Sequence, residues 1–464
     1  MDIQSAKHIH FTGIKGVGMT SIALCAQDLG ATISGSDVKE EFVTDSVLKN
    51  RKIPFKSNFS TQNIPTQTDL LIYTGAHQGE NNVEVKHAKS QNISVISHAE
   101  AVGQLMKGKI GISVCGVGGK TTTSSMIATI LEELNQNPSY SIGVAAINNL
   151  NSPGKYDRTS KHLIAEADEY IVSPGSDNTP RFLLQKPQII VCTNIAHDHP
   201  DVYPTQNDII KAYVDFFNTL SPTDVLIANV DSLPLAKIVK SWKKSKLVTF
   251  GSASSVQWQV VSVIIKNQTT TAQIKTPQGN KTLTLKIPGQ FNIMNAVAAI
   301  IAAHNLGLSL DKSIFALSKF TGTKRRFERV GEKDNILYYD DYAHHPSEIR
   351  ATIKAAKLWF PNKTIKVAFQ PHTFSRTKKL FTKFTQSFSQ ADEIWFTDIY
   401  ASAREKPDPN VSSQKLEANT PRSQYVGDLK SLVKYARQHL KQGDVFLTLG
   451  AGDIYKIHQQ LLNA

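Results

Sequence analysis

A glycine-rich stretch near the middle of the chain has the residue types of a phosphate-binding turn. It reads Gly116-Val117-Gly118-Gly119-Lys120-Thr121-Thr122. Such a turn can point backbone N–H groups and the start of a helix at phosphate oxygens, while lysine supplies positive charge and a threonine hydroxyl can bind Mg²⁺. The common P-loop has four residues between its first glycine and its Gly-Lys pair, whereas only two separate Gly116 from Gly119. The stretch therefore predicts a shortened nucleotide site; the alternative is a structural turn before a helix.

Carboxylates follow a second apolar stretch, His162–Glu166, which is expected to be a buried strand. Asp168 and Glu169 come shortly after it. Because α/β proteins bind ligands at the carboxyl ends of their strands, these acidic side chains lie where a ligand is expected. Mg²⁺ on nucleotide phosphates takes one or two carboxylates and several waters. The group predicts a magnesium site, and the alternative is a solvated acidic loop.

Histidine and aspartate are concentrated after another expected strand, Ile189–Asn194. Two of each occur within five residues, namely His197, Asp198, His199 and Asp201. Closely spaced histidine and aspartate residues could form a zinc site. Oxygen-rich surroundings and the phosphate-binding turn favour a role around Mg²⁺ instead.

The beginning of the chain holds a looser glycine pattern. An expected strand, His8–Thr12, is followed by Gly13, Gly16 and Gly18, and a second strand ends at Asp37. That spacing resembles a dinucleotide-binding fingerprint without matching G-x-G-x-x-G. Taken alone, the pattern fits either a nucleotide-binding turn or a strand–helix turn that needs glycine.

Polar residues also occur beside apolar stretches in the last part of the chain. Asn292 and Asn295 stand at the start of an alanine-rich helix, where their amides could hydrogen-bond a base. The other candidates are Arg326, Asp341, His345, His372 and Arg376. Their types alone do not separate a binding site from a polar surface.

The elements that must position these residues alternate between strands and helices along the whole chain. Strand, glycine turn and helix recur in three segments, so we expect an α/β fold of mostly parallel sheets covered by helices. Alternating Val, Ile and Thr in Gln257–Leu285 indicate an antiparallel patch on the central sheet. We place three domains at residues 1–107, 108–322 and 323–464.

The composition of the 464 residues narrows the class of protein. Charged residues make up 20% and hydrophobic residues 40%, and neither a long apolar run nor a secretory pattern is present, so we expect no membrane insertion. A net charge of +13 is compatible with binding to nucleic acid. Because the sequence contains no nucleic-acid-binding motif, we favour a protein that binds small anions. Cys25, Cys115 and Cys192 lack metal-binding spacing, which indicates buried thiols in a reducing cytoplasm.

Together and in order, these motifs resemble the Mur ligase family, the ATP-dependent amide-forming enzymes of peptidoglycan synthesis. That family uses a shorter nucleotide loop, G-x-x-G-K-[ST]-[ST], which Gly116–Thr122 matches. The resemblance covers essentially the whole chain, including Thr323–Phe327, Asp340–Pro346 and Phe369–Arg376. It implies three domains: a Rossmann-like N-terminal domain for the UDP part of a substrate, a P-loop-type central ATPase domain, and a Rossmann-like C-terminal domain that brings the amino acid.

The resemblance also implies a reaction, because it is strongest to one branch of the family. That branch joins L-alanine to the muramoyl carboxylate of UDP-N-acetylmuramate through an acyl phosphate, using ATP and Mg²⁺. We accordingly expect a cytoplasmic monomer or weak homodimer with small-molecule substrates and no nucleic-acid or membrane partner.

By family match, each candidate residue takes a role. The predicted catalytic residues are Lys120, Glu166, His199, Arg326 and Asp341. The predicted ATP-binding residues are Gly116, Val117, Gly118, Gly119, Lys120, Thr121, Thr122, Asn292, Asn295 and Arg326. The predicted metal ligands are Thr121, Glu166 and His199. The predicted residues for the UDP substrate are Gly13, Gly16, Val17, Gly18, Met19, Asp37, Thr74 and Ala76. The predicted acceptor or muramoyl ligands are His345, His372 and Arg376.

Three departures from the family pattern concern the second substrate. Val117 and Gly118 stand where this branch has Thr and His, so a histidine contact to substrate is lost. An extra segment, Ser173–Pro180, is rich in Pro, Gly, Ser and Asn and is expected to be a loop near the muramoyl site. Ala196 replaces an acidic residue of the family.

Two alternatives to the alanine-adding branch stay open. One is the murein-tripeptide recycling ligase of the same family, which Glu166–Tyr170 favours and Phe369–Arg376 disfavours. The other is a nucleotide-binding regulator that kept the fold and lost catalysis, which the altered turn and Ala196 would explain. Retention of Lys120, Glu166 and His199 argues against the regulator.

Overall fold

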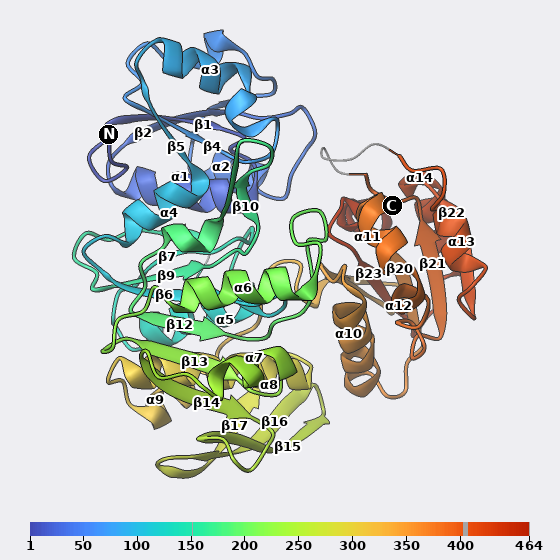
Figure 1. The fold of residues 1–464 in the computed structure, drawn as a ribbon. Helices are drawn as coiled ribbons and strands as arrows, with labels where there is room; N and C mark the ends of the chain where they lie inside the picture. The colour runs from blue at the N-terminus through green and yellow to red at the C-terminus, as the bar shows by residue number, and fades with distance from the viewer. Residues whose placement is uncertain (151, 402–406, 464) are drawn as a thin grey trace. The chain divides into compact units, whose positions relative to one another are not determined.

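The computed structural model describes residues 1–150, 152–401 and 407–463 (Figure 1). The described chain divides into two compact units. The first unit consists of Met1–Ser262, Gln273–Leu283 and Met294–Phe320. The second unit consists of Val263–Ala272, Thr284–Ile293 and Thr321–Ala464.

The N-terminal sheet of the first unit has five strands in the order β3-β2-β1-β4-β5, all paired in parallel. The strands are β1 (His8–Thr12), β2 (Thr32–Ser36), β3 (Phe55–Lys56), β4 (Leu70–Tyr73) and β5 (Ser94–Ser97). The helices are α1 (Val17–Asp28), α2 (Asp45–Asn50), α3 (Val83–Ser90) and α4 (His98–Met106), with 3-10 turns η1 (Thr61–Asn63) and η2 (Gly79–Asn81). The chain turns from one side of β1 to the other between β3 and β4, so the loops after β1 and β4 flank the crevice where such sheets bind ligands.

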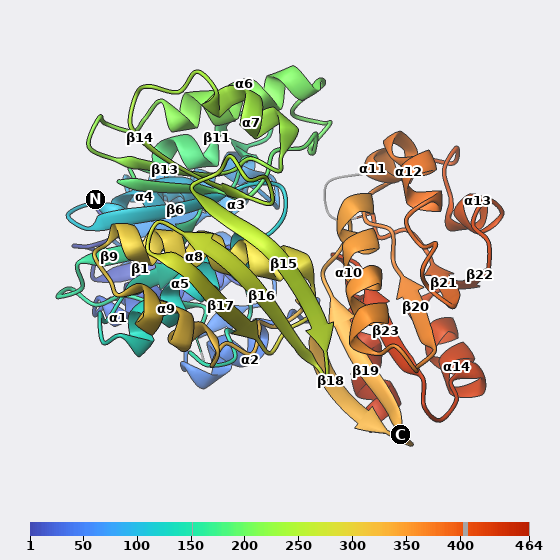
Figure 2. The same cartoon turned by 90° about the horizontal axis from the view of Figure 1, so that it is seen from below.

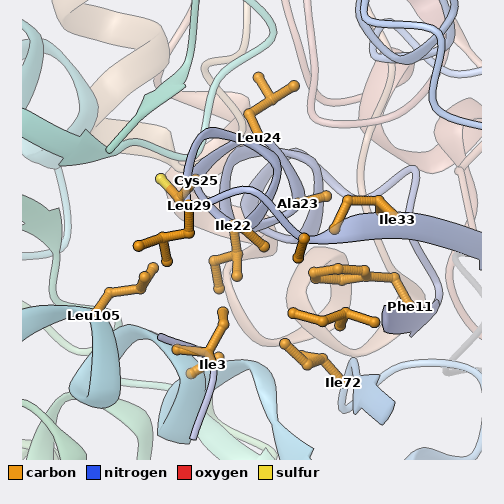
Figure 3. Close-up of a cluster of buried hydrophobic side chains, with 14 of the residues drawn as sticks. Ile3, Phe11, Ile22, Ala23, Leu24, Cys25, Leu29, Ile33, Ile72 and Leu105 are labelled. Atoms are coloured by element: carbon orange, nitrogen blue, oxygen red, sulfur yellow. The ribbon is translucent and has the colours of Figure 1, made fainter. Parts of the chain in front are cut away.

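Apolar side chains fix α1 against this sheet. Ile22 and Cys25 of α1 lie in one fully buried cluster with Phe11 of β1 and Ile72 of β4 (Figure 3). Strands of a parallel sheet are covered on both faces, which explains why they read as continuous apolar runs. Because α1 begins directly after the glycine turn that follows β1, its buried face also holds that turn in place.

A ten-stranded sheet follows the N-terminal sheet along the chain, in the order β17-β16-β15-β14-β13-β12-β6-β9-β7-β8. Its first strands are β6 (Ile110–Cys115), β7 (Ser139–Ser141), β8 (Gly154–Lys155), β9 (His162–Glu166) and β12 (Ile189–Cys192). Its later strands are β13 (Val225–Asn229), β14 (Lys246–Gly251), β15 (Trp258–Lys266), β16 (Thr269–Thr276) and β17 (Gly279–Leu285), of which the last three are long neighbouring strands (Figure 2). The helices are α5 (Lys120–Glu133), α6 (Gln206–Phe217), α7 (Leu233–Val239), α8 (Gln290–Asn305) and α9 (Leu310–Leu317).

The strand order of this sheet decides which sequence motifs meet. β6 lies between β9 and β12 and pairs in parallel with both. The carboxyl ends of the three strands therefore lie at one edge, where the glycine turn, the acidic segment and the His–Asp segment begin. The expected parallel α/β core is thus confirmed.

The expected loop at Ser173–Pro180 is wrong, because most of the segment belongs to a β-hairpin. β10 (Ile171–Ser173) pairs antiparallel with β11 (Asp177–Pro180), and the 3-10 turn η3 (Arg181–Leu184) follows. The connection consists of Pro174, Gly175 and Ser176, and Gly175 has a φ of +82°. The residues on either side are left to pair, which composition alone does not reveal.

The second unit contains a six-stranded sheet in the order β18-β19-β23-β20-β21-β22. Its strands are β18 (Glu328–Lys333), β19 (Ile336–Asp341), β20 (Ile365–Phe369), β21 (Glu393–Thr397), β22 (Ser423–Gly427) and β23 (Val445–Leu449). Its helices are α10 (Pro346–Trp359), α11 (Phe374–Lys379), α12 (Phe381–Thr385), α13 (Ser413–Glu417), α14 (Leu429–His439) and α15 (Ile457–Leu462), with the 3-10 turn η4 (Ile454–Lys456). β18 and β19 are antiparallel, and the other pairs are parallel. Two buried apolar clusters join the sheet to its helices. One contains Val367 of β20 and Ile353 of α10, and the other contains Phe446 of β23 and Leu432 of α14.

The expectation of buried free thiols is confirmed. Cys25, Cys115 and Cys192 are buried and carry no disulfide. Among the helices of the described chain, none combines the length and the apolar character that a membrane crossing requires.

Candidate active site

The turn between β6 and α5 is shaped by two glycines. Gly116 and Gly119 have φ values of +131° and +90°, a region that favours glycine. A Cβ on Gly116 would lie 2.2 Å from Oγ1 of Thr193, and one on Gly119 would lie 2.5 Å from Oδ1 of Asn295. Both positions therefore exclude a side chain, and Asn295, a predicted nucleotide ligand, lies against the turn.

Gly118, one of the two residues that depart from the family pattern, is held by the segment after β12. Its N–H donates to Oδ1 of Asn194 at 3.1 Å, and its carbonyl accepts from Nδ2 of Asn194 at 2.8 Å. Oγ1 of Thr193 donates to the same carbonyl at 2.6 Å. The peptide at Gly118 is thus oriented through its backbone without a side chain. The sequence-based candidates omitted Asn194, whose signal is its place at the carboxyl end of the strand next to β6.

Lys120 is held at the turn by a buried carboxylate. Its Nζ donates to the carbonyl of Gly116 at 2.7 Å and to Oε2 and Oε1 of Glu169 at 2.9 and 3.2 Å. Burial disfavours the charge on Lys120, but Glu169 outweighs burial and raises the pKa of the ammonium group above its usual value. Lys120 is therefore a cation at neutral pH. Glu169 was not among the predicted site residues, although it lies in the acidic segment.

Two predicted metal ligands are in contact. Oγ1 of Thr121 donates to Oε2 of Glu166 at 3.1 Å, and Oε1 of Glu166 accepts from the N–H of Gly143 at 2.7 Å. A hydroxyl and a carboxylate oxygen side by side are the donor types that Mg²⁺ takes beside nucleotide phosphates. Thr121 and Glu166 therefore fit the predicted magnesium site.

A second cluster of possible ligands joins His199 to the acidic segment. Asp168, Glu169 and His199 each offer one ligand atom, and these atoms lie within 4.8 Å of one another. Nε2 of His199 is 3.6 Å from Oε1 of Glu169. Burial works to lower the pKa of His199, but Glu169 and Asp198 outweigh it and raise the pKa. A divalent cation and a proton would compete for this position, because a metal binds only the neutral imidazole.

The predicted UDP-substrate residues collect at the carboxyl edge of the N-terminal sheet. Gly13 has a φ of +84°, and a Cβ on it would lie 2.4 Å from Cγ2 of Thr74. The carboxylate of Asp37 accepts from the N–H groups of Lys15 at 2.7 Å and Val38 at 2.8 Å, which fastens the glycine turn to the end of β2. The loops after β1, β2 and β4 and the start of α1 thus carry Gly13, Gly16, Val17, Gly18, Met19, Asp37, Thr74 and Ala76.

Helix α8 carries both predicted adenine ligands. Asn295 reaches the glycine turn as described, and Nδ2 of Asn292 donates to the carbonyl of Pro288 at 2.6 Å. One donor of Asn292 thus holds the start of the helix on which Asn295 lies.

In the second unit, Asp341 ends β19 beside Arg326. Its carboxylate accepts from the N–H groups of Phe327 and Ala343, both at 2.7 Å. Burial raises the pKa of Asp341 to about 6, against the opposing effect of Arg326. The guanidinium of Arg326 lies 5.2 Å from the centre of the Tyr342 ring. The structure therefore brings together the two predicted catalytic residues of this unit.

The predicted acceptor ligands are placed differently from one another. NH1 of Arg376 lies 3.3 Å from Nδ1 of His372, whose ring stacks on Tyr400 with centroids 5.6 Å apart. The ring of His344 is 6.1 Å from that of His372. His345 caps the start of α10 through its ring. The structure thus groups His372 and Arg376 with His344, which the sequence-based candidates omitted, and gives His345 a helix-capping contact.

Three models of one family match the chain in order. They are "Mur ligase family, catalytic domain" at residues 8–110, "Mur ligase middle domain" at residues 114–303 and "Mur ligase, glutamate ligase domain" at residues 325–452. The matches run through both the turn after β1 and the turn after β6.

Curated relatives match along their whole length. The UDP-N-acetylmuramate–L-alanine ligase of Desulfitobacterium hafniense is 38% identical, covering 98% of this chain and 99% of the relative. The enzyme of the same name from Desulforamulus reducens is 37% identical, covering 98% and 97%. Among solved structures, UDP-N-acetylmuramate-alanine ligase from Thermotoga maritima has a TM-score of 0.81 at 26% identity and covers 99% of this chain and 98% of its own. A murein peptide ligase from Psychrobacter arcticus has a TM-score of 0.73 at 23% identity, covering 98% of each chain, and shares the fold.

Proposed function

Because this chain belongs to the Mur ligase family, we propose that it joins L-alanine to the muramoyl carboxylate of UDP-N-acetylmuramate, converting ATP to ADP and phosphate. The family consists of ATP-dependent ligases, and relatives that carry this substrate pair in their names match the chain from end to end. The observation that carries the proposal is the meeting of Lys120, the Thr121–Glu166 pair and His199 at one edge of the central sheet.

The proposed reaction activates a carboxylate, because oxide is a poor leaving group. A carboxylate oxygen of the muramoyl group attacks the γ-phosphorus of ATP, the bond to the bridging β-phosphate oxygen breaks, and ADP leaves with the electron pair. The amine of L-alanine then attacks the carbonyl carbon of the acyl phosphate. Phosphate leaves, and the nitrogen loses a proton.

The first step needs positive charge, since a carboxylate must approach a polyphosphate. Catalysis of phosphoryl transfer rests mainly on positioning and on stabilising charge over the transferred group. Lys120 supplies one cation, and the turn of Gly116 and Gly119 lets backbone N–H groups approach phosphate oxygens closely. Mg²⁺ would neutralise further phosphate charge, with Thr121 and Glu166 as ligands of one ion and His199 as a ligand of a second.

Glu169 has a positioning role in this proposal. Its carboxylate contacts Lys120 and lies close to His199, so it holds the two groups in a common orientation before the substrates bind. In the second unit, Arg326 and Asp341 would serve the nucleotide, while His372 and Arg376 would serve the acceptor or muramoyl group. In this proposal, residues 1–107 form the domain that binds the UDP substrate. Residues 108–322 form the domain that binds ATP, and residues 323–464 form the domain that binds the amino acid.

An omission assay tests the proposed reaction. Phosphate release by the purified chain is expected to require UDP-N-acetylmuramate, ATP, Mg²⁺ and L-alanine together. Lys120→Ala should reduce turnover by about 10²–10³-fold, the scale of losing one charge-stabilising donor. Turnover that does not depend on L-alanine, or a strong preference for the L-alanyl-γ-D-glutamyl-meso-diaminopimelate tripeptide, would reject the proposal. A complete lack of ligation with intact ATP binding would favour the non-catalytic regulator.

We further propose that the protein acts in the cytoplasm, where nucleotide substrates are made and where its buried thiols stay reduced.

A further inference from the structure

The β10–β11 hairpin returns the chain to the acidic segment from which it departs. The N–H of Arg181, which follows the hairpin, donates to the carbonyl of Tyr170, which precedes it, at 2.9 Å. The N–H of Phe182 donates to the carbonyl of Asp168 at 3.1 Å. The extra segment therefore does more than lengthen a surface connection: it delivers Arg181 beside Asp168.

The guanidinium of Arg181 is held firmly yet keeps donors for a ligand. NH1 donates to Oδ2 of Asp168 at 2.7 Å, and Nε donates to the carbonyl of Ile171 at 3.1 Å. The guanidinium carbon lies 5.5 Å from the centre of the Tyr170 ring. Within the described part of the chain, NH2 has no hydrogen-bond partner, and the side chain is 16% exposed. A guanidinium that is fixed on one side and open on the other is suited to bind a planar anion.

Arg181 also faces the UDP-substrate half of the first unit. A Cβ on Gly75 would lie 3.2 Å from NH2 of Arg181 and 2.2 Å from the carbonyl oxygen of Val172. Gly75 stands between Thr74 and Ala76, two of the predicted UDP-substrate residues. The absence of a side chain at Gly75 thus lets the hairpin and the guanidinium approach the loop after β4.

On its other side, Arg181 reaches the proposed phosphoryl-transfer cluster. Its partner Asp168 shares that cluster with Glu169 and His199. Burial works to raise the pKa of Asp168, but Arg181, followed by Lys120, outweighs it and holds the pKa well below its usual range. Arg181 therefore lies between the loop after β4, which carries predicted UDP-substrate residues, and the proposed phosphoryl-transfer cluster.

We propose that Arg181 binds the carboxylate of the sugar-nucleotide substrate and holds it for attack on the γ-phosphate. This inference rests on the proposed function, which supplies a substrate with a nucleotide at one end and a reacting carboxylate at the other. NH2 and the second N–H of NH1 can donate to the two oxygens of a carboxylate, while Asp168 and the carbonyl of Ile171 hold the guanidinium in a fixed orientation. The hairpin thereby contributes a specificity-determining residue of the central domain. The diphosphate is the competing ligand, and the experiment separates the two.

Binding measurements on Arg181 variants test the proposal. Calorimetric titrations with a non-hydrolysable ATP analogue and Mg²⁺ present would compare UDP-N-acetylmuramate with UDP-N-acetylglucosamine, which has the same diphosphate and no carboxylate. Arg181→Gln is expected to weaken binding of the muramate about 10–100-fold, the scale of hydrogen bonds to a charged group, and to leave the glucosamine compound within about two-fold. Arg181→Lys keeps the charge without the fork and should fall between. Lys186→Gln, which removes one exposed charge shortly after the 3-10 turn η3, is the matched control.

Steady-state kinetics provide the second measurement. For Arg181→Gln, the KM for UDP-N-acetylmuramate should rise while the KM for ATP stays within about two-fold. Equal losses for both sugar nucleotides would assign Arg181 to the diphosphate or to the packing of the hairpin, and unchanged binding of both would also overturn the proposal. Ligation by the wild-type chain is measured first, so that failure of the proposed function is seen independently of any Arg181 variant.

Discussion

Lys120 and Glu169 form an ion pair at the start of α5, with Nζ 2.9 Å from Oε2, and the side chain of Glu169 is only 1% exposed. Glu169 lies on the segment after β9, whereas Lys120 follows β6, so the pair exists because these strands are neighbours. The same carboxylate is 3.6 Å from the ring of His199. One buried acid thus links the cation of the turn to the histidine after β12.

Replacing Glu169 by glutamine should lower kcat because it removes a charge that orients two groups of the proposed site. Glu169→Gln removes the charge partner of Lys120 and of His199, so both groups lose their common orientation. We expect kcat to fall by about 10²-fold, a loss comparable to that of one preorganised charge interaction. The measurement is initial-rate phosphate release with all substrates saturating. Glu133→Gln at the other end of α5, which removes a partly exposed partner of Lys319, is the control and should leave kcat within about two-fold. Equal kcat values for the two variants would contradict a special role for Glu169.

The stability contributed by His199 should depend on pH. Glu169 and Asp198 raise its pKa in the folded protein above the ordinary value of about 6.5. Protonation therefore favours folding: the contribution is complete below the unfolded pKa and disappears as pH rises through the folded pKa. In buffer without divalent cations, the Tm deficit of His199→Gln relative to wild type should be larger near pH 5.5 than near pH 9. A deficit that stays constant over this range would show that His199 is not charged in the folded protein.

Asp341 should show the opposite dependence. Burial raises its pKa to about 6, so its ionisation opposes folding. The penalty is absent below the unfolded pKa of about 4, grows as pH rises towards 6, and reaches about 3 kcal/mol at most. Asp341→Asn gives up one acceptor but removes the ionisation, so its Tm relative to wild type should improve between about pH 4.5 and pH 7.5.

Asp408 provides the control for Asp341. Its pKa is lowered, first by the hydrogen bond from Lys378, so ionised Asp408 favours folding above the unfolded pKa and this contribution is lost as pH falls. Asp408→Asn should therefore lose stability relative to wild type only as pH rises towards the unfolded pKa of about 4, and its deficit should stay level between about pH 4.5 and pH 7.5, where Asp341→Asn gains stability. Parallel trends in the two variants would contradict the opposite pKa shifts.

A side chain on Gly119 should weaken nucleotide binding, an effect separate from the backbone strain that any side chain causes at a positive φ. In Gly119→Ala, the new Cβ would meet Oδ1 of Asn295 at 2.5 Å and the backbone has a φ of +90°. We expect the KM for ATP to rise at least about 10-fold, because the turn must shift away from phosphate oxygens. Gly307→Ala is the matched control, since Gly307 has a φ of +83° after α8 with open space around it. It should lower Tm without a change in the KM for ATP; similar KM values in both variants would remove the turn from the nucleotide site.

The sequence by itself determined the features that depend on short stretches of chain. The order of strand, glycine turn and helix around Gly116–Thr122 predicted the turn, because a buried strand and a helix leave their signals within a few residues. The acidic segment after β9 and the His–Asp segment after β12 were recognisable in the same way. Family membership followed from the order of these local motifs along the chain, and the comparisons confirm it.

Only the tertiary structure decided which side chains meet, because partners come from segments far apart in sequence. The placement of β6 between β9 and β12 selects Glu169 as the partner of Lys120 and Asn194 as the clamp on Gly118. Hairpin pairing, which the turn-rich composition of Ser173–Pro180 concealed, returns Arg181 to Asp168. Strand order and pairing are long-range choices made by packing of the whole sheet, and single residue types carry no record of them.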